Sequence, residues 1–425
     1  MILQFKVNNF RSIKDTAILS MQTDKNEATP NTFTVGKQHL LKSCVIYGAN
    51  ASGKSNVLKA MAFMREIVLN SSKVTQSTDS LLHTPFRLNT ETEAASSHFE
   101  IIFLHDDFKY RYGFEMDSST VYSEWLFVAK GTARESRLIE RDSEEKEPYT
   151  NPVKFKEGRG VKVPDNQLLL WRCDQQGGEV SRIILQWFHN FNFIDGLENK
   201  AYFNFALKQM QNDTTKSGLI DLLHRADLGI DALDINEQDM SIEQLDKVFM
   251  PKQVREQLLQ GQGEIKSIEV QAQHKKFDMD NNLVGVEVFQ FEQDESQGTQ
   301  KFFALSAPIL DTLQHGKVLL IDELDASLHP KLTEAFVRLF HNPEINKHNA
   351  QLIFTTHDTN LLSVPKLFER DQVWFTEKDQ YGSTELYSLL EFRKNTKGKD
   401  VRATDNLEKH YLQGSFGGTP YLGAF

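Results

Sequence analysis

The order of hydrophobic and polar positions predicts strands near both ends of the chain and helices in its middle. Short apolar or alternating runs, which are typical of strands, lie at residues 2–10, 17–21, 43–47, 99–103, 110–114, 124–128, 265–277, 283–291, 318–321 and 352–356, with two more in 372–390. Apolar residues recur at helical spacing in 56–70, 181–259 and 300–313. The pattern therefore predicts an α/β protein with buried strands and amphipathic helices.

The middle of the chain divides into a strand region and a region of helical periodicity. Between residues 99 and 128, three aromatic and β-branched runs separated by short polar turns predict an antiparallel meander. Residues 134–148 are dense in charges of both signs, which indicates a solvated hairpin or loop. Residues 181–259 show helical spacing without a sustained heptad repeat, so we expect a compact, mostly helical insertion and no long coiled coil.

Composition narrows the class of protein without naming a function. The 425 residues include 48 Lys+Arg and 59 Asp+Glu, and this formal net charge of −11 argues against binding to nucleic acid or membrane through overall electrostatics. The overall charge does not exclude a local contact with DNA through the basic run at 393–402. No run approaches the ~18 apolar residues that a membrane span needs, and Cys44 and Cys173 are far apart in sequence. We therefore expect a cytoplasmic protein with no membrane partner.

A glycine-containing loop between the predicted strand 43–47 and helix 56–70 has the full GxxxxGK[ST] pattern of a phosphate-binding loop. In such a loop, successive backbone N–H groups and the helix N-terminus surround the phosphates of a nucleotide. The lysine then reaches the β- and γ-phosphates, and the hydroxyl of the last residue binds Mg²⁺. The residues of this predicted ATP site are Gly48, Ala49, Asn50, Ala51, Ser52, Gly53, Lys54, Ser55 and the following Asn56.

Two carboxylates follow the buried strand at 318–321. Asp322 stands at the strand end, where it would hold Mg²⁺ directly or through water, and Glu323 would act as the general base on the attacking water. An apolar strand that ends in two acidic residues is common in proteins. Its presence beside a phosphate-binding loop favours the catalytic interpretation, which makes ATP and Mg²⁺ the expected cofactors.

Five segments of the chain resemble compact ABC-type ATPases, within the AAA superfamily, that are related to RecF and chromosome-maintenance ATPase heads. The resemblance is narrower to the RloA-like, abortive-infection and PARIS AriA-like ATPases of bacterial anti-phage defence. It rests on NNFRSIKD (8–15), YGANASGKSN (47–56), LIDELDASLHP (320–330), TTHDTNLL (355–362) and RDQVWFTEK (370–378). It is weak from 134 to about 265. The resemblance implies a P-loop NTPase fold of the ABC-ATPase type, combined with the β meander and helical insertion expected above.

The resemblance also implies roles for residues outside the two main motifs. His357, after the strand 352–356, matches the switch histidine that contacts the γ-phosphate. Ser296 and Gly298 lie about where ABC ATPases carry a signature that binds the nucleotide of the other subunit, although Glu295 replaces the usual leucine. Arg11 would lie near the nucleotide of its own subunit, and Asp325 would face the partner. ATP would therefore be held between two heads of a homo-dimer or larger homo-oligomer.

The expected organisation is one ATPase head made from both ends of the chain. Residues 1–130 and 265–425 would form the head, and 131–264 would form the charged loop and helical insertion. Asp278-Met279-Asp280 matches the DxD of a metal-dependent nuclease, but its setting favours a turn between two strands. Since the length leaves little room for a second catalytic domain, we expect a separate effector protein.

For the biological role, the resemblance implies a sensor and scaffold in anti-phage defence. Such a protein would control a separate effector, expected to be a nuclease, and would respond to a phage protein as trigger. One alternative is a RecF-like DNA-repair ATPase that binds DNA directly through the basic run 393–402. A third interpretation is a nucleotide-dependent scaffold that hydrolyses ATP negligibly.

Overall fold

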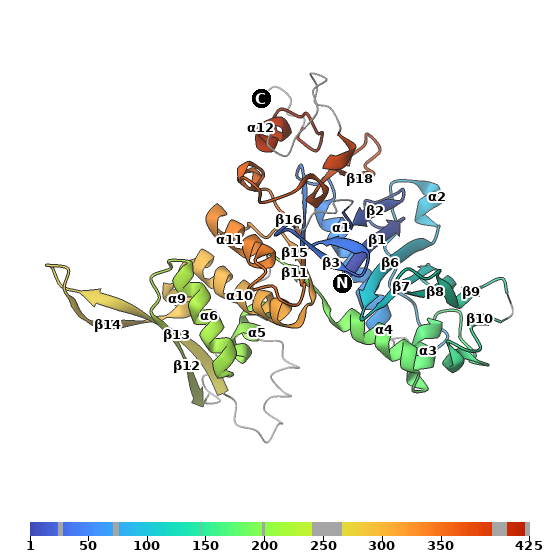
Figure 1. The fold of residues 1–425 in the computed structure, drawn as a ribbon, viewed down its shortest axis with the longest axis horizontal. Coiled ribbons are helices and arrows are strands. Elements are labelled where there is room, and N and C mark those ends of the chain that lie inside the picture. Colours follow the sequence, from blue (N-terminus) through green and yellow to red (C-terminus); the bar gives the residue numbers. More distant parts are fainter. Residues whose placement is uncertain are drawn as a thin grey trace. The chain divides into compact units, whose positions relative to one another are not determined.

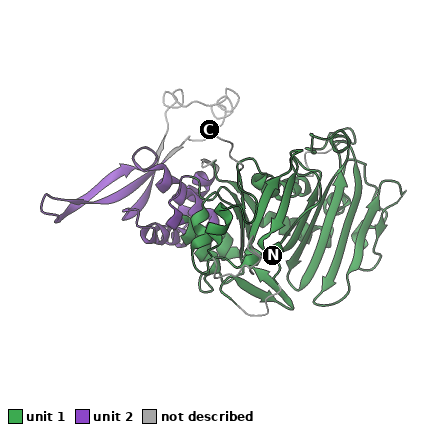
Figure 2. Ribbon diagram, turned by 90° about the horizontal axis from the view of Figure 1, so that it is seen from above, with its two compact units in different colours: residues 1–197, 311–326, 333–425 green, residues 198–310, 327–332 purple. Residues whose placement is uncertain are grey.

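The computed structural model describes residues 1–23, 29–70, 76–145, 147–197, 200–239, 266–392 and 406–420. The chain forms two compact units (Figure 2). The first contains residues 1–197, 311–326 and 333–425, and the second contains residues 198–310 and 327–332. No helix in the described ranges is both long and apolar enough to cross a membrane.

A six-stranded sheet in the first unit positions the predicted motifs (Figure 1). Its strand order is β11-β15-β16-β5-β17-β18, and every neighbouring pair is parallel except β17 and β18. The strands β5, β15 and β16 are buried along their whole length, which explains why they are continuous apolar runs in the sequence. The bounds are β5 (Ser43–Gly48), β11 (Phe191–Asp195), β15 (Val318–Asp322), β16 (Gln351–Thr355), β17 (Val373–Lys378) and β18 (Thr384–Ser388).

Helix α1 (Lys54–Leu69) packs against this sheet, with contacts to β5, β11, β15 and β16. Val57, Met61, Met64 and Val68, which the sequence pattern places on one face, are all buried. Phe63 also packs against Phe99 of the second sheet of this unit, with ring centroids 5.2 Å apart, and against Phe10, at 5.1 Å. Both sheets therefore share one hydrophobic core with α1.

The second sheet is seven-stranded and antiparallel, in the order β10-β9-β8-β7-β6-β1-β2. It confirms the predicted meander and extends it through the charged segment 134–148, because Leu138 and Ile139 of β9 are buried in the core. The expected domain boundary at 130 therefore falls within the sheet. The bounds are β1 (Ile2–Asn8), β2 (Ala17–Ser20), β6 (Ser97–His105), β7 (Phe108–Met116), β8 (Val121–Lys130), β9 (Ser136–Asp142) and β10 (Tyr149–Thr150).

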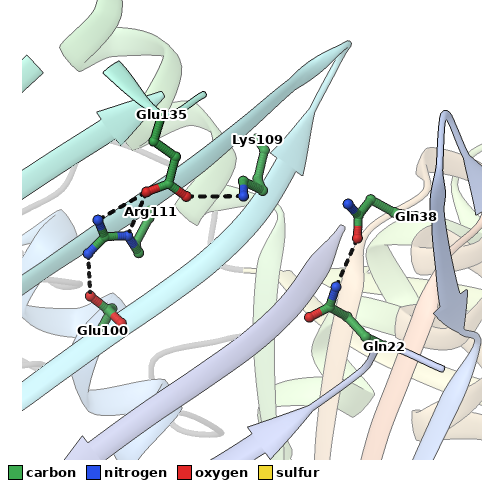
Figure 3. A network of polar contacts seen from close by, with 6 residues as sticks. All are labelled: Gln22, Gln38, Glu100, Lys109, Arg111 and Glu135. Atoms are coloured by element: carbon green, nitrogen blue, oxygen red, sulfur yellow. Dashed lines mark hydrogen bonds and ion pairs between the residues drawn. The ribbon is translucent and has the colours of Figure 1, made fainter. Parts of the chain in front are cut away.

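Charged side chains on the seven-stranded sheet neutralise one another (Figure 3). The guanidinium of Arg111 binds Glu135 at 3.0 and 3.1 Å and Glu100 at 3.3 Å, and Lys109 Nζ lies 3.0 Å from the Glu135 carboxylate. Beside this network, the Gln22 amide donates to Gln38 at 2.8 Å. Because the two basic groups of this cluster are paired with two carboxylates, the cluster itself carries no net charge.

The second unit contains a three-stranded antiparallel sheet, β12-β13-β14, formed by β12 (Ala232–Asp239), β13 (Lys266–Phe277) and β14 (Leu283–Gln290). Helices α5 (Lys200–Met210) and α6 (Asp213–Arg225) agree with the helical prediction. The strand β12 does not follow that prediction, and residues 240–259 lie outside the described ranges. Since β13 pairs with both other strands, residues 265–310 belong with the insertion and not with the C-terminal part of the head.

The remaining elements are short or connect these sheets. They are β3 (Thr32–Val35), β4 (Gln38–Leu41), α2 (Thr90–Glu93), α3 (Leu169–Gln175), α4 (Glu179–His189), α9 (Phe291–Asp294), α10 (Gln297–His315), α11 (Pro330–His341) and α12 (Leu407–Leu412). The Asp278-Met279-Asp280 segment forms the turn between β13 and β14, as expected, with Asp278 accepting bonds from the backbone N–H groups of Asp280 and Asn282.

Candidate functional site

The phosphate-binding pattern forms the loop between β5 and α1, and its two glycines have no room for a side chain. A Cβ on Gly48 would lie 2.5 Å from both Ser52 Oγ and Thr376 O. A Cβ on Gly53, whose φ of 107° is also in the left-handed region, would lie 2.1 Å from Thr384 Oγ1. Atoms of Ser52, Thr376 and Thr384 therefore lie directly against the loop, and only glycine fits at these two positions.

Side chains distant in sequence hold this loop in place. Thr384 Oγ1 donates to Ser52 O at 2.9 Å and lies 2.7 Å from Ser12 Oγ. Asn56 donates to the same Ser12 hydroxyl at 2.7 Å. Arg11, next to Ser12, is exposed, with φ 50° and its N–H donated to Thr84 O at 2.7 Å. Because Arg11 is next to Ser12 in the chain, its backbone lies near the loop. The sequence did not predict that Ser12 and Thr384 contact the loop.

Lys54 is buried at the mouth of the loop. Its Nζ donates to Gly48 O at 2.9 Å and to Ala49 O at 3.1 Å. Burial lowers the pKa of Lys54, while the nearby carboxylates of Glu323, Asp322 and Asp325 act in the opposite direction. A cation held by two loop carbonyls can exchange them for phosphate oxygens, which carry a full negative charge.

The hydroxyl group of Thr355 hydrogen-bonds to both predicted acidic residues, to the side chain of one and to the backbone of the other. Asp322, only 4 % exposed at the end of β15, accepts a bond from Thr355 Oγ1 at 2.6 Å. The same oxygen accepts the backbone N–H of Glu323 at 2.8 Å, where the chain turns with φ 51°. Lys59 Nζ lies 4.0 Å from the second carboxylate oxygen of Asp322. Thr355 of β16 thus orients the metal-binding candidate and the backbone of the candidate base together.

Asp325 and His357 also meet within this unit. The backbone N–H of His357 points to both carboxylate oxygens of Asp325, at 3.2 and 3.3 Å, and the His357 side chain is exposed. The resemblance implied that Asp325 faces a partner subunit. In the chain itself Asp325 braces the turn that carries His357, which gives it a second role that sequence reasoning missed.

The edge strand β11 contributes a close backbone contact that the sequence did not predict. Its register places Asp195 beside Asp322. The next residue, Gly196, donates its N–H to Asp322 O at 2.9 Å, and a Cβ there would lie 2.2 Å from that oxygen. The absence of a side chain at Gly196 therefore allows its backbone to contact the backbone of Asp322 and Glu323.

The signature candidates belong to the second unit, and the loop and acids belong to the first. Ser296 Oγ accepts the N–H of Thr299 at 3.1 Å and so caps the start of α10, while its side chain is exposed. A Cβ on Gly298 would lie 2.9 Å from Ser327 O. Glu295, in place of the usual leucine, has its carboxylate 2.6 Å from His274 Nε2. The exposed helix start fits a role toward another molecule.

The donor set of the site fits Mg²⁺ bound together with a nucleotide. Among the residues that the structure describes, no group of three or more His, Cys, Asp and Glu side chains could hold a metal by itself. Mg²⁺ in phosphate-binding sites uses one or two protein oxygens and completes its shell with phosphate and water. The Ser55 hydroxyl and Asp322 carboxylate supply such oxygens.

Comparison with solved structures found several matches of low sequence identity. The SMC head domain from Thermotoga maritima is 14 % identical, with a TM-score of 0.42, and the match covers 91 % of this chain and 98 % of that one. The recombination mediator RecF with ATP is also 14 % identical, with a TM-score of 0.31 and coverage of 91 % and 97 %. No curated protein matches the chain.

Comparison with protein families gave a match over most of the chain. Residues 44–363 match the family described as "AAA domain, putative AbiEii toxin, Type IV TA system". The matched part includes the phosphate-binding loop, both acids of the β15 end and His357. With the two sheets described above, the match confirms the predicted P-loop fold of the ABC-ATPase type. The chain therefore belongs to this AAA family of ATPases.

Proposed function

We propose that the protein is a Mg²⁺-dependent ATPase that holds ATP between the heads of two identical chains. The observation that carries the proposal is the Thr355 hydroxyl, which fixes Asp322 and the Glu323 backbone together in the unit that also contains the phosphate-binding loop. A purely structural loop and strand end would not need a buried carboxylate and a left-handed turn held by the same hydrogen-bonding group.

Each residue of the site then has a definite task. The backbone N–H groups of residues 48–55 bind the phosphates, and Lys54 exchanges its bonds with the loop carbonyls for bonds to the β- and γ-phosphates. Ser55 and Asp322 hold Mg²⁺, which would supply charge neutralisation at the phosphates. Glu323 takes the proton from the attacking water, and His357 contacts the γ-phosphate. Arg11 lies near the nucleotide of its own chain.

The Glu323 assignment is tested with Glu323→Gln. This variant keeps the shape of the site but removes the base, so we expect normal ATP binding, loss of turnover and accumulation of an ATP-bound dimer or larger assembly. Glu344→Gln, a change at an exposed glutamate after α11, is the matched control and leaves turnover unchanged. Unchanged ATPase activity in Glu323→Gln would show that another group is the base.

The role of Ser296 and Gly298 toward the partner is tested by mixing two inactive variants. In a mixed dimer of Lys54→Ala and Ser296→Arg chains, one of the two shared sites has no substitution. An equal mixture should therefore recover about a quarter of wild-type activity, because half of the dimers are mixed and each has one intact site. No recovery, from chains that still dimerise with ATP, would mean that Ser296 acts within its own chain.

For the biological role, we propose a cytoplasmic sensor and scaffold in anti-phage defence that controls a separate effector, such as a nuclease. The support is the resemblance of the motifs and a family description that refers to the AbiEii toxin. The test is phage infection of cells that carry the gene and its neighbours, with wild type compared with Glu323→Gln. Equal plaque counts with and without the wild-type genes, across a varied phage panel, would reject this role. The alternative contact with DNA depends on residues 393–402, which lie outside the described ranges.

A further inference from the structure

The strand β14 is exposed and apolar, which is unusual for a strand in a sheet. Every residue from Leu283 to Phe289 is exposed, and five of these seven side chains are large and apolar, at 37 to 60 % exposure. They are Leu283, Val284, Val286, Val288 and Phe289. Phe277 at the end of β13 and Met279 in the turn that follows are also exposed. An apolar group of this kind on a soluble protein marks a contact surface.

The position of β14 in its sheet exposes its backbone as well. In the order β12-β13-β14 it is an edge strand, hydrogen-bonded to β13 on one side and to none of the other described strands on the opposite side (Figure 1). Exposed edges are normally protected by lysine, proline or a bulge. Within 283–290 there is neither lysine nor proline. The register against β13 shifts once, at the start of β14 between Leu283 and Gly285, so the residues from Gly285 onward form a regular edge. The one charged residue, Glu287, forms an ion pair with Lys276 of β13.

We propose that β14 pairs antiparallel with β14 of a second copy of this chain, centred on Val286. A two-fold axis perpendicular to the sheet places one residue opposite its own copy. With Val286 at the axis, Val284 faces Val288 and Glu287 faces Gly285, while Leu283 lies beyond the register shift of β14 and takes no part in the pairing. Pairs of β-branched residues stabilise antiparallel strands. The ladder would continue the three-stranded sheet into a six-stranded sheet shared by two chains.

The charge on β14 selects this register over its neighbours. An axis at Glu287 would place two carboxylates directly opposite each other, which is destabilising. An axis at Gly285 would leave Val288 and Phe289 outside the apolar pairs. Only the axis at Val286 pairs the three valines with one another and leaves the single charge opposite a glycine. A strand that is complementary to itself in this way fits a second copy of the chain.

The register gives a direct cross-linking test, because Val286 faces itself. Val286→Cys should form a disulfide-linked dimer rapidly on mild oxidation without nucleotide. Val284→Cys should not do so alone, but should cross-link when mixed with Val288→Cys. Val153→Cys, an exposed position in the first unit, is the control for random collisions, and both native cysteines are buried. Rapid cross-linking of Val284→Cys with itself, or none of Val286→Cys beyond the control, would overturn the proposal.

A second measurement separates this contact from the ATP-dependent one. Without nucleotide, and equally in a Lys54→Ala background, the chain should be a dimer by light scattering. Val286→Lys should be a monomer of unchanged circular dichroism that still binds ATP. A wild-type chain that is monomeric at all concentrations without ATP, or a dimer that survives Val286→Lys, would refute self-pairing through β14. Neither outcome depends on whether the heads hydrolyse ATP.

Discussion

The Thr355 hydroxyl offers the most direct test of the proposed mechanism. Thr355→Val removes it with almost no change in shape. The buried carboxylate of Asp322 then loses the donor that lies at 2.6 Å, and the Glu323 N–H loses its acceptor at 2.8 Å. One substitution thus removes a hydrogen bond from each of two groups, at the end of the strand that carries both assigned acids.

The cost can be worked out from these two bonds. A hydrogen bond to a charged group contributes roughly 1.5–3 kcal/mol, and an unsatisfied backbone N–H costs roughly 1–3 kcal/mol. Because both changes share one atom, they are not additive, and we expect the free energy of unfolding to fall by about 2–4 kcal/mol. Loss of an orienting partner behind a metal ligand typically lowers activity about 10–100-fold. We expect turnover to fall within that range.

The assay uses urea unfolding followed by tryptophan fluorescence, together with steady-state ATP hydrolysis. All four tryptophans, Trp125, Trp171, Trp187 and Trp374, belong to the first unit, so their fluorescence follows the unit that contains the site. Thr355→Ser restores the hydroxyl and should behave almost as wild type. Thr312→Val is the matched control, because Thr312 is buried but its hydroxyl has no hydrogen-bond partner among the described residues. Wild-type stability and turnover in Thr355→Val, or an equal loss in Thr312→Val, would refute the reasoning.

Two further predictions concern a glycine beside the site and a buried histidine, His341, whose ring hydrogen-bonds Ser43 at the start of β5. Gly196→Ala would place a Cβ 2.2 Å from Asp322 O, so we expect a loss of about 1–3 kcal/mol and of ATPase activity; Gly218→Ala, with 3.5 Å to its nearest neighbour, should keep wild-type turnover. Burial lowers the pKa of His341 to about 3. Neutral His341 therefore stabilises the fold above the unfolded pKa of about 6.5, and about 2 kcal/mol of this is lost by pH 5. His341→Gln should remove that part of the pH dependence in urea titrations at pH 7 and pH 5.

The strands that carry the motifs could be predicted because each of them is a run of consecutive apolar residues. A strand covered on both faces needs an unbroken apolar run, and β5, β15 and β16 have one. The strand β11 could not be predicted in this way, since Asn192 interrupts its apolar residues and it begins two residues after helix α4 ends. Its identity as a strand depends on pairing with β15, more than a hundred residues later in the chain.

The same distinction applies to the site. The loop at 48–55 and the acid pair at 322–323 are local patterns, so their chemistry could be read from adjacent residues. Ser12, Thr384 and Gly196 act through contacts with backbone or hydroxyl groups that are distant in sequence. No local pattern marks a serine that supports a loop or a glycine that avoids a carbonyl oxygen. Such residues become visible only when the fold brings the segments together.

The two proposed contacts between chains use different units and respond to different conditions. The ATP-dependent contact involves the phosphate-binding loop of one chain and the exposed start of α10 in another, whereas the β14 contact needs no nucleotide. A chain with two distinct two-fold contacts can bind two neighbours at once, so ATP would convert a constitutive dimer into assemblies of four or more chains. Glu323→Gln with ATP should therefore form such assemblies, and Glu323→Gln combined with Val286→Lys should stop at a dimer. Light scattering distinguishes the two, and a double variant that still grows beyond a dimer would show that the larger assembly does not use β14.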